Sequence, residues 1–354
     1  MGGLSLGVDI SVLIPTFGRA QKLARCLARL SRQDLDHRRY EVLIGVDGKD
    51  EANEPDDEAA QAVRALASTS AGAMRAVVFE FDHAGPGATR NRLARHAEGK
   101  LLLLLNDDVL PEETLLSAHL RAHEEWSARS GRAAMALGAA PWVVPGSAGQ
   151  DSVFDRLVRE TSMIFFYDRM QEAIDKGEAG TDHDWGFRHA WTLNLSLPRS
   201  EFERAGGFDE RLTYACYEDL EFARRVHDGG RVPVLYRPEC VVHHDHRITP
   251  QSYLARERLM GRAALQLAAA SPECAREIFG RDITSAEELA YSREFVRREQ
   301  TLADRLRGTL EALAGVPSNA VGEDAGVLLR ALYEQHLLLK RWTWRAGLVE
   351  SRQG

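Results

Sequence analysis

Five consecutive leucines, Leu101–Leu105, constrain the fold of this chain more than any other segment. A short run that is apolar at every position is typical of a strand covered on both faces of a sheet. Three earlier segments that are mainly apolar are also predicted to be strands, at residues 10–14, 40–46 and 75–81. Segments with helical patterns lie between these runs, which predicts right-handed crossovers and a mainly parallel sheet.

The helical segments are recognised by spacing and composition. Leu23, Leu27 and Leu30 recur at helical spacing, and residues 56–68 are rich in alanine. Residues 87–97 complete the strand-helix alternation. Beyond residue 131 the pattern is looser, with strands expected at 133–139 and 191–197 and helices at 200–205 and 219–227.

The C-terminal part has a different pattern. From residue 250 the chain is nearly all helix-forming, in stretches near 250–270, 285–314 and 323–346. A chain of 354 residues has room for one large domain and a smaller appendage. We therefore expect an α/β domain over residues 1–249 and a helical appendage over residues 250–354.

Composition disfavours several classes of protein. A net charge of -8 argues against a general nucleic-acid binder, which carries a basic excess. Four cysteines stand far apart without a CxxC pair, so we expect no disulfide framework and a reducing compartment. The N-terminus lacks the basic and apolar regions of a signal peptide, and Leu101–Leu105 is too short to span a bilayer. These features predict a soluble, cytoplasmic protein.

Polar residues follow three of the expected strands, where open α/β sheets bind their ligands. These segments are residues 15–19 (PTFGR), 47–48 (DG) and 106–108 (NDD). Side chains alternate along a strand, so we expect Asn106 and Asp108 to point one way and Asp107 the other. Two oxygen-bearing side chains on one face suit Mg²⁺ or Mn²⁺. On spacing alone, a helix N-cap formed by Asp107 or Asp108 before Pro111 explains the segment equally well.

Residues 85–91 (GPGATRN) precede a helix and form a second candidate. Their glycines let the backbone approach a ligand, and Arg90 can pair with a phosphate through two hydrogen bonds. The segment lacks the Lys-Ser/Thr pair of a P-loop, and no GxGxxG follows the first strand, so both of those nucleotide-binding motifs are disfavoured. An ordinary loop and helix cap is the alternative interpretation.

Carboxylates and imidazoles supply the remaining candidates. Glu218 and Asp219 begin a helix, where the helix dipole stabilises a carboxylate and where one of them can instead act as a general base. After a strand-like segment at 240–242, His244 and His246 share one face and His243 the other, and either set can supply a metal ligand. A closed zinc site with Cys240 lacks a second pair of ligands.

Taken in order, these segments resemble the inverting family 2 glycosyltransferases of the GT-A fold, with a galactosyltransferase-type C-terminal part. The matching segments are 12–19 (VLIPTFGR), 45–48 (GVDG), 88–92 (ATRNR), 104–108 (LLNDD), 194–197 (NLSL), 206–210 (GGFDE) and 217–221 (YEDLE). Each is weak alone, but the ordered set is specific and covers about residues 8–247.

The resemblance implies a nucleotide-sugar donor, with a UDP-sugar expected, and a glycan, lipid-linked or other hydroxyl acceptor. The residues implied in donor binding are Pro15, Thr16, Arg19, Asp47, Arg90, Asn91, Asn106, Asp107 and Asn194. Asp108 is implied as a ligand of Mn²⁺ or Mg²⁺, with His244 or His246 as a further ligand. Asp219 is implied as the base that activates the acceptor hydroxyl, and Glu218 as the residue that orients the acceptor.

Two positions depart from the family pattern. Asn106 stands where the family's Asp-x-Asp motif has its first acid, and residues 47–50 read DGKD in place of Asp-Asp-Gly-Ser. A non-catalytic sugar-nucleotide-binding or scaffold protein is therefore one alternative, which the presence of Asp219 with the histidines disfavours. A nucleotidyltransferase is another, and residues 15–19 lack the Gly-rich, basic loop that it would need.

The C-terminal segment 337–345 (LLLKRWTWR) combines apolar, cationic and aromatic residues. Such a helix packs on the rest of the protein or on a partner subunit, or it lies at a membrane surface. Peripheral contact with the inner membrane face and oligomer formation therefore stay open at this point.

Overall fold

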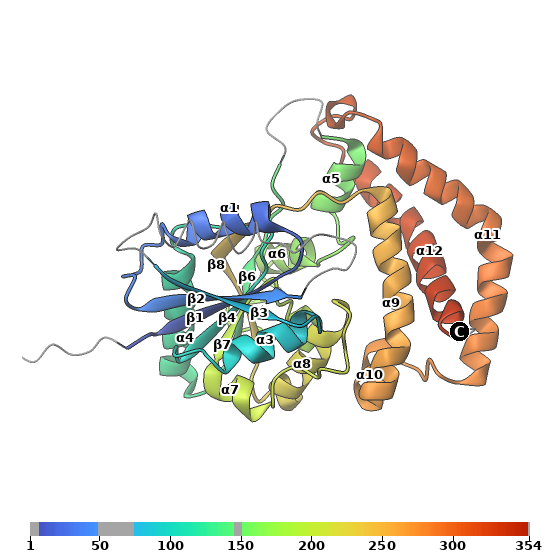
Figure 1. Cartoon of the computed structure of the whole chain (residues 1–354). Helices are drawn as coiled ribbons and strands as arrows, with labels where there is room; N and C mark the ends of the chain where they lie inside the picture. The colour runs from blue at the N-terminus through green and yellow to red at the C-terminus, as the bar shows by residue number, and fades with distance from the viewer. Residues whose placement is uncertain (1–6, 49–73, 145–150, 353–354) are drawn as a thin grey trace, which may run out of the picture. The chain divides into compact units, whose positions relative to one another are not determined.

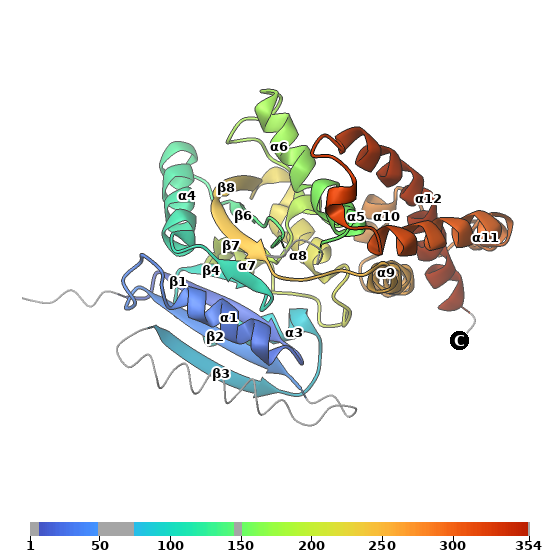
Figure 2. The ribbon, with the colours of Figure 1, turned by 90° about the horizontal axis from the view of Figure 1, so that it is seen from above.

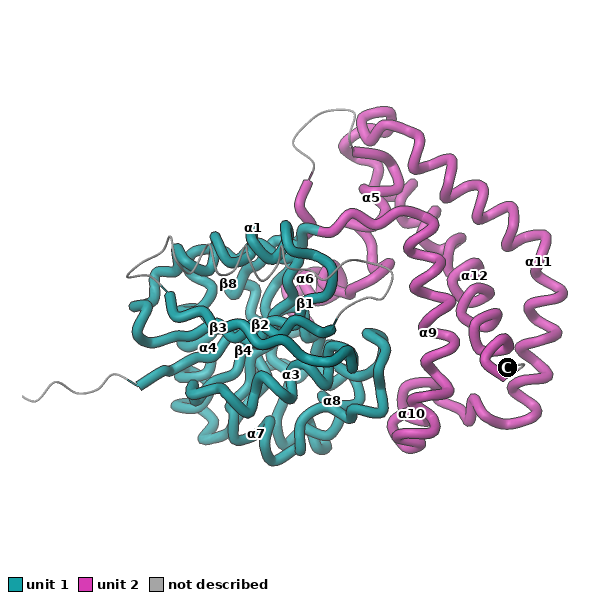
Figure 3. The backbone as a smooth tube through the Cα atoms, in the orientation of Figure 1, with its two compact units in different colours: residues 1–141, 179–245 teal, residues 142–178, 246–354 magenta. Residues whose placement is uncertain are grey.

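The computed structural model describes residues 7–48, 74–144 and 151–352. The chain packs as two compact units, coloured separately in Figure 3. The first combines Met1–Pro141 with Ala179–Asp245, and the second combines Trp142–Glu178 with His246–Gly354. Residues 142–178 thus pack with the C-terminal helices, although they precede the expected boundary at residue 250. The division into independent domains 1–249 and 250–354 stays a prediction.

An eight-stranded sheet organises the first unit, with the order β3-β2-β1-β4-β7-β6-β8-β5. Its strands are β1 (Ile10–Thr16), β2 (Tyr40–Asp47), β3 (Arg75–Phe81), β4 (Leu101–Leu105), β5 (Val109–Pro111), β6 (Met135–Ala139), β7 (Asn194–Pro198) and β8 (Val234–His244). Strands β1 to β4 pair in parallel, as do β6 and β8. Strand β7 runs antiparallel to β4 and β6, and β5 antiparallel to β8. The prediction of an α/β fold with a mainly parallel sheet flanked by helices is confirmed.

Helices of the described residues pack with this sheet in the first unit. They are α1 (Ala20–Leu30), α3 (Pro86–Ala94), α4 (Leu115–Ser130), α7 (Arg199–Arg204) and α8 (Glu218–His227). Figure 1 shows α1 on one side of the sheet and α3 on the other. A Cβ at Gly45 in β2 would overlap the Thr89 methyl group, so a glycine is needed where α3 approaches β2. The helix expected at residues 56–68 lies outside the described residues.

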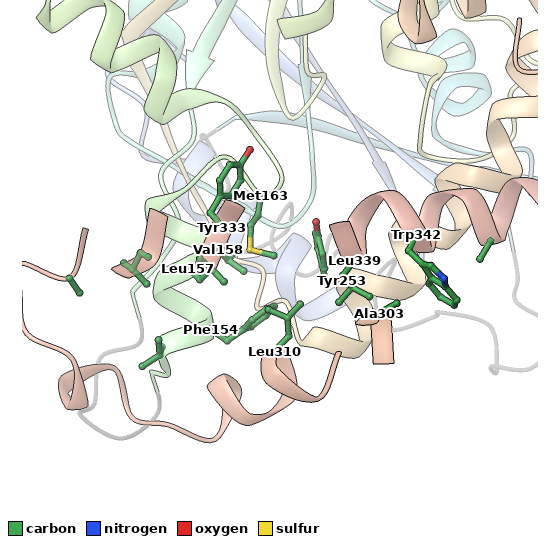
Figure 4. Packing of buried hydrophobic residues seen from close by; sticks show 14 of the residues in the cluster. Phe154, Leu157, Val158, Met163, Tyr253, Ala303, Leu310, Tyr333, Leu339 and Trp342 are labelled. Atoms are coloured by element: carbon green, nitrogen blue, oxygen red, sulfur yellow. The ribbon is translucent and has the colours of Figure 1, made fainter. Parts of the chain in front are cut away.

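The second unit is helical. It contains α5 (Val153–Glu160), α6 (Tyr167–Asp175), α9 (Pro250–Ala270), α10 (Pro272–Phe279), α11 (Ala286–Ala314) and α12 (Gly326–Glu350). Figure 2 gives a second view of these helices, and Figure 4 shows the side chains that pack between them. The core includes Phe154 of α5, Tyr253 of α9, Leu310 of α11 and Trp342 of α12. The three long helices expected after residue 250 are confirmed, whereas α6 and α10 were not anticipated.

Two composition-based expectations can be compared with the structure. All four cysteines are buried as thiols, as expected for a chain without a disulfide framework. Within the described ranges, no helix is both long and apolar enough to cross a membrane. Leu339 and Trp342 of the segment 337–345 lie in the core of the second unit, so α12 directs these apolar side chains inward.

Candidate functional site

The carboxyl ends of β1 and β4 bring together the polar residues that follow them. The Thr16 hydroxyl, at the last position of β1, donates a 2.7 Å hydrogen bond to Asp107 Oδ2. The Arg19 guanidinium bridges two carboxylates, with Nη2 2.7 Å from Asp107 Oδ1 and Nη1 2.7 Å from Asp108 Oδ2. Pro15 lies one residue earlier in β1, where it pairs with Gly45. Two of the three strand ends that are polar in sequence, those of β1 and β4, therefore form one cluster.

Burial makes this cluster a site that favours a cation. Asp107 is fully buried and Asp108 is 4% exposed, whereas the Arg19 side chain is 39% exposed. Burial raises the pKa of Asp107 to about 6, against the lowering effect of the neighbouring Arg19. Buried carboxylates are costly unless paired, so these two require a positive partner. Arg19 supplies that partner in this structure.

The expected orientation of residues 106–108 is wrong. Asp107 and Asp108 share Arg19, whereas the Asn106 side-chain oxygen accepts a 2.9 Å hydrogen bond from Arg90. Strand alternation does not apply because β4 ends at Leu105 and the chain turns before β5. The helix-cap alternative is also wrong, since α4 begins at Leu115 with Thr114 as its N-cap.

Asp108 and His244 are the best-placed pair for a divalent ion. Asp108 Oδ2 lies 3.7 Å from His244 Nε2, and one ion with ligand distances of about 2.1 Å can reach both atoms. Asn106 is engaged by Arg90, and His243 Nε2 lies 3.0 Å from Glu112 Oε1. His246 belongs to the second unit. In the part of the chain that the structure describes, no group of three or more His, Cys, Asp or Glu side chains is arranged to hold a metal.

Arg90 connects this cluster to the acidic start of α8. Its side chain is 2% exposed, and its guanidinium carbon lies 5.8 Å from the centre of the Phe208 ring. Burial lowers the pKa of Arg90, while the charges of Glu218, Asp219 and Asp107 oppose that shift. The buried Arg90 guanidinium thus interacts electrostatically with a carboxylate after β4 and with those at the start of α8.

Glu218 and Asp219 occupy different environments although they are adjacent. Glu218 is 4% exposed and accepts a 2.8 Å hydrogen bond from the Cys216 backbone amide. Burial, reinforced by Asp219 and opposed by Arg90, raises the pKa of Glu218 to about 8. Asp219 is only partly buried and accepts a hydrogen bond from the Leu220 amide at 2.8 Å. Near neutral pH, Glu218 is therefore mostly protonated.

This raised pKa predicts a pH-dependent gain in stability for Glu218→Gln. As pH rises from 5 to 8, the unfolded chain loses a proton that the folded chain retains, so wild-type stability falls. Because glutamine does not titrate, the advantage of the variant should grow by up to about 4 kcal/mol over this window. Melting temperatures of both proteins at pH 5 and pH 9 measure it. Glu203→Gln, at an exposed site, is the control. If the melting temperatures of Glu218→Gln and wild type differed by the same amount at pH 5 and pH 9, the raised pKa of Glu218 would be contradicted.

Asp47 organises the loop before α3. Its two carboxylate oxygens accept 2.9 Å hydrogen bonds from the backbone amides of Ala84 and Gly85. His83 Nδ1 lies 3.2 Å from Asp47 Oδ2, and the His83 ring is 5.1 Å from the ring of Phe17. Phe17, which is 39% exposed, was not selected from the sequence. Its position directly after a strand end was the only available signal.

The side chains of Asn91 and Asn194 hold neighbouring segments of the fold together through hydrogen bonds. Asn91 accepts from the Phe208 amide at 2.8 Å and donates to the Phe208 carbonyl at 2.9 Å, so it fixes the turn that leads to Glu218. Asn194 is fully buried in β7, where its oxygen lies 2.9 Å from His119 Nε2 and its nitrogen donates to the Cys240 carbonyl. A role of either residue in donor binding stays a prediction.

The sequence is similar to that of known glycosyltransferases. Residues 11–130 match the family model described as glycosyl transferase family 2. Validoxylamine A glucosyltransferase of Streptomyces hygroscopicus subsp. jinggangensis is 29% identical over 254 residues, which cover 69% of this chain and 57% of that protein. The uncharacterized glycosyltransferase YfnE of Bacillus subtilis is 23% identical over 266 residues, which cover 67% of this chain and 64% of that protein. The matched region is therefore less than two thirds of each relative's length.

A solved structure with a similar fold is that of the mannosyltransferase PcManGT from Pyrobaculum calidifontis, in complex with GDP-Man and Mn²⁺. Its TM-score is 0.56 at 17% sequence identity, and the alignment covers 97% of this chain and 87% of that chain. At this identity the likeness concerns the fold, and it agrees with a GT-A type sheet flanked by helices.

Proposed function

Because the chain belongs to the family 2 glycosyltransferases of the GT-A fold, we propose that it moves a sugar from a nucleoside-diphosphate donor to an acceptor hydroxyl, with inversion at the anomeric carbon. The observation that carries this proposal is the position of Arg90. It donates to Asn106 and lies within electrostatic reach of Asp107, Glu218 and Asp219. The cation-favouring cluster and the acidic start of α8 therefore belong to one site.

The donor diphosphate would lie at the carboxyl ends of β1 and β4. Asp108 and His244 fit Mn²⁺ or Mg²⁺, because their oxygen and nitrogen lie 3.7 Å apart and Asp108 already faces a cation. When bound, such an ion neutralises charge on the departing diphosphate. Arg19, whose side chain is partly exposed, would then be available to pair with a phosphate oxygen. His246 as a further ligand remains part of this proposal.

The start of α8 would supply the acid-base chemistry. Asp219, the more exposed of the two acids, would accept the proton of the acceptor hydroxyl. Glu218, held protonated by burial, would donate a hydrogen bond that orients the acceptor. A single in-line displacement then inverts the anomeric centre, and no covalent intermediate is required.

Donor recognition would use the end of β2 and the loops that follow β1 and β3. Phe17 presents an exposed ring suited to stacking on a nucleobase, and Asp47 holds the neighbouring backbone of Ala84 and Gly85 in place. The relatives named as a glucosyltransferase and a mannosyltransferase support a hexose donor, with a UDP-sugar as our first choice. The acceptor would be a glycan, a lipid-linked compound or another hydroxyl compound.

We place this activity in the cytoplasm, in line with four cysteines that are present as thiols. The burial of Leu339 and Trp342 favours the interpretation of α12 as a packed helix over a membrane-surface helix. Peripheral membrane contact and oligomer formation stay predictions.

A panel of UDP- and GDP-sugars incubated with Mn²⁺ tests the proposal, with release of nucleoside diphosphate as the measurement. We expect slow donor hydrolysis without acceptor, its loss with EDTA and its recovery when Mn²⁺ is restored. Asp108→Asn should weaken Mn²⁺ binding, measured by calorimetry, whereas Asp304→Asn on α11 should leave it unchanged. Pyrophosphate release would instead identify a nucleotidyltransferase, and donor binding without turnover would identify a non-catalytic protein.

A further inference from the structure

The second unit contains a small polar pocket that the proposed transfer reaction does not use. Its volume is about 270 Å³. The lining includes Ser162, Asp168, Arg169, Leu329, Arg330 and Tyr333, from the segment after α5, the start of α6 and the start of α12. Of these residues, Ser162, Leu329 and Tyr333 are buried, whereas the charged residues are exposed.

Two of the buried residues that line the pocket are part of the core of the second unit. The side chains of Leu329 and Tyr333 belong to the same hydrophobic cluster as those of Leu157 and Val158. Figure 4 shows the Tyr333 hydroxyl directed away from the other labelled core residues. That hydroxyl accepts a 3.1 Å hydrogen bond from Arg169, which leaves its proton available for donation to a ligand. Tyr333 is therefore a fixed polar group on a rigid helix.

The charges around the pocket balance. The lining contains two acids, Glu160 and Asp168, and two bases, Arg169 and Arg330. Glu160 accepts two hydrogen bonds from Arg156, and Asp168 accepts one of 2.6 Å from Ser162. A pocket without net charge does not select a free ion, but it offers both donors and acceptors to a neutral ligand.

These features together define the ligand class. The volume lies just below the roughly 300–1,000 Å³ of pockets for drug-sized ligands, so a smaller molecule fits. The hydroxyls and carboxylates of the lining, together with the apolar side chain of Leu329, suit a molecule that is hydroxylated on its edges and apolar on one face. We propose that this pocket binds a neutral monosaccharide unit of a glycan. The site lies wholly within the second unit and does not depend on the proposed transfer activity.

Methyl NMR of the full-length chain tests this proposal with glucose, mannose and galactose as probes. The Leu329 methyl groups report on the pocket, and those of the exposed Leu302 on α11 are the control. We expect at least one sugar to shift the Leu329 signals saturably at millimolar concentration and to leave Leu302 unchanged. Absence of such a shift with all three sugars, or a saturable shift with inorganic phosphate, overturns the proposal.

A matched pair of tyrosine variants adds a second criterion. Tyr333→Phe keeps the ring in the core but removes the hydroxyl, and should weaken sugar binding about three- to tenfold. Tyr291→Phe removes a hydroxyl that accepts a 2.7 Å hydrogen bond from Arg341 elsewhere in the unit, and should have no effect. Equal affinities of wild type and Tyr333→Phe would contradict the site. Donor hydrolysis, measured on the same variants, should stay at the wild-type rate if the two activities are separate.

Discussion

Asp219→Asn is expected to reduce sugar transfer by about 10²- to 10⁴-fold, the usual contribution of a general base. The amide cannot accept the proton of an acceptor hydroxyl, but it has nearly the same volume and can still accept the 2.8 Å hydrogen bond from the Leu220 amide. The start of α8 should therefore keep its structure. Since Arg19 and Asp108 are unchanged, donor affinity should also persist.

The rate of nucleoside diphosphate release in the presence of acceptor measures this effect, and calorimetric titration of the donor measures binding. Asp228→Asn at the other end of α8 is the matched control. Asp228 has a φ of 45°, a conformation that asparagine tolerates well, and its side chain is 57% exposed. That variant should transfer sugar at the wild-type rate. Wild-type turnover by Asp219→Asn would show that the base lies elsewhere.

Local sequence patterns predicted the central strands well because burial leaves a simple signature. Leu101–Leu105 and Arg75–Phe81 have the bounds expected from sequence. Strand β8 was recognised only near its end, since Pro238 and Glu239 interrupt its apolar pattern and are exposed. Strand β5 has only three residues and ends in Pro111, so it gives no periodic signal.

The proximity of two polar strand ends was predicted from sequence, but the contacts of their side chains were not. The strand-end rule correctly brought residues 15–19 to residues 106–108, because parallel strands meet at one edge. The directions of the Asn106, Asp107 and Asp108 side chains depend on a turn after Leu105, where the alternation of side chains along a strand no longer applies. The bridge from Arg19 to both carboxylates and the burial of Glu218 arise from residues distant in sequence. Pairings of this kind have no local signature.

The helical unit shows the same limit, because one of its close helix contacts is made by two residues with no periodic signal. Gly261 of α9 and Gly347 of α12 lie where the two helices touch. A Cβ at Gly261 would overlap the carbonyl oxygen of Trp344, and a Cβ at Gly347 would overlap that of Arg258. Both obstacles are backbone atoms, so a side-chain rotation cannot relieve them. The helices have to move apart instead.

Gly261→Ala is therefore expected to destabilise the second unit by at least about 1–3 kcal/mol, the usual cost of overpacking. Helix propensity alone would favour alanine by roughly 0.5–1 kcal/mol, so the sign of the effect identifies the close contact. Thermal unfolding of the full chain, followed by circular dichroism, should show a transition several degrees lower than in wild type.

Gly308→Ala in α11 is the matched control, because a Cβ there would meet no atom within 4 Å. The same substitution should raise the transition temperature at this position, where only propensity acts. Opposite shifts in the two variants would separate a steric effect from a general effect of alanine. If Gly261→Ala instead melted at or above the wild-type temperature, the axes of α9 and α12 would have to lie farther apart than described.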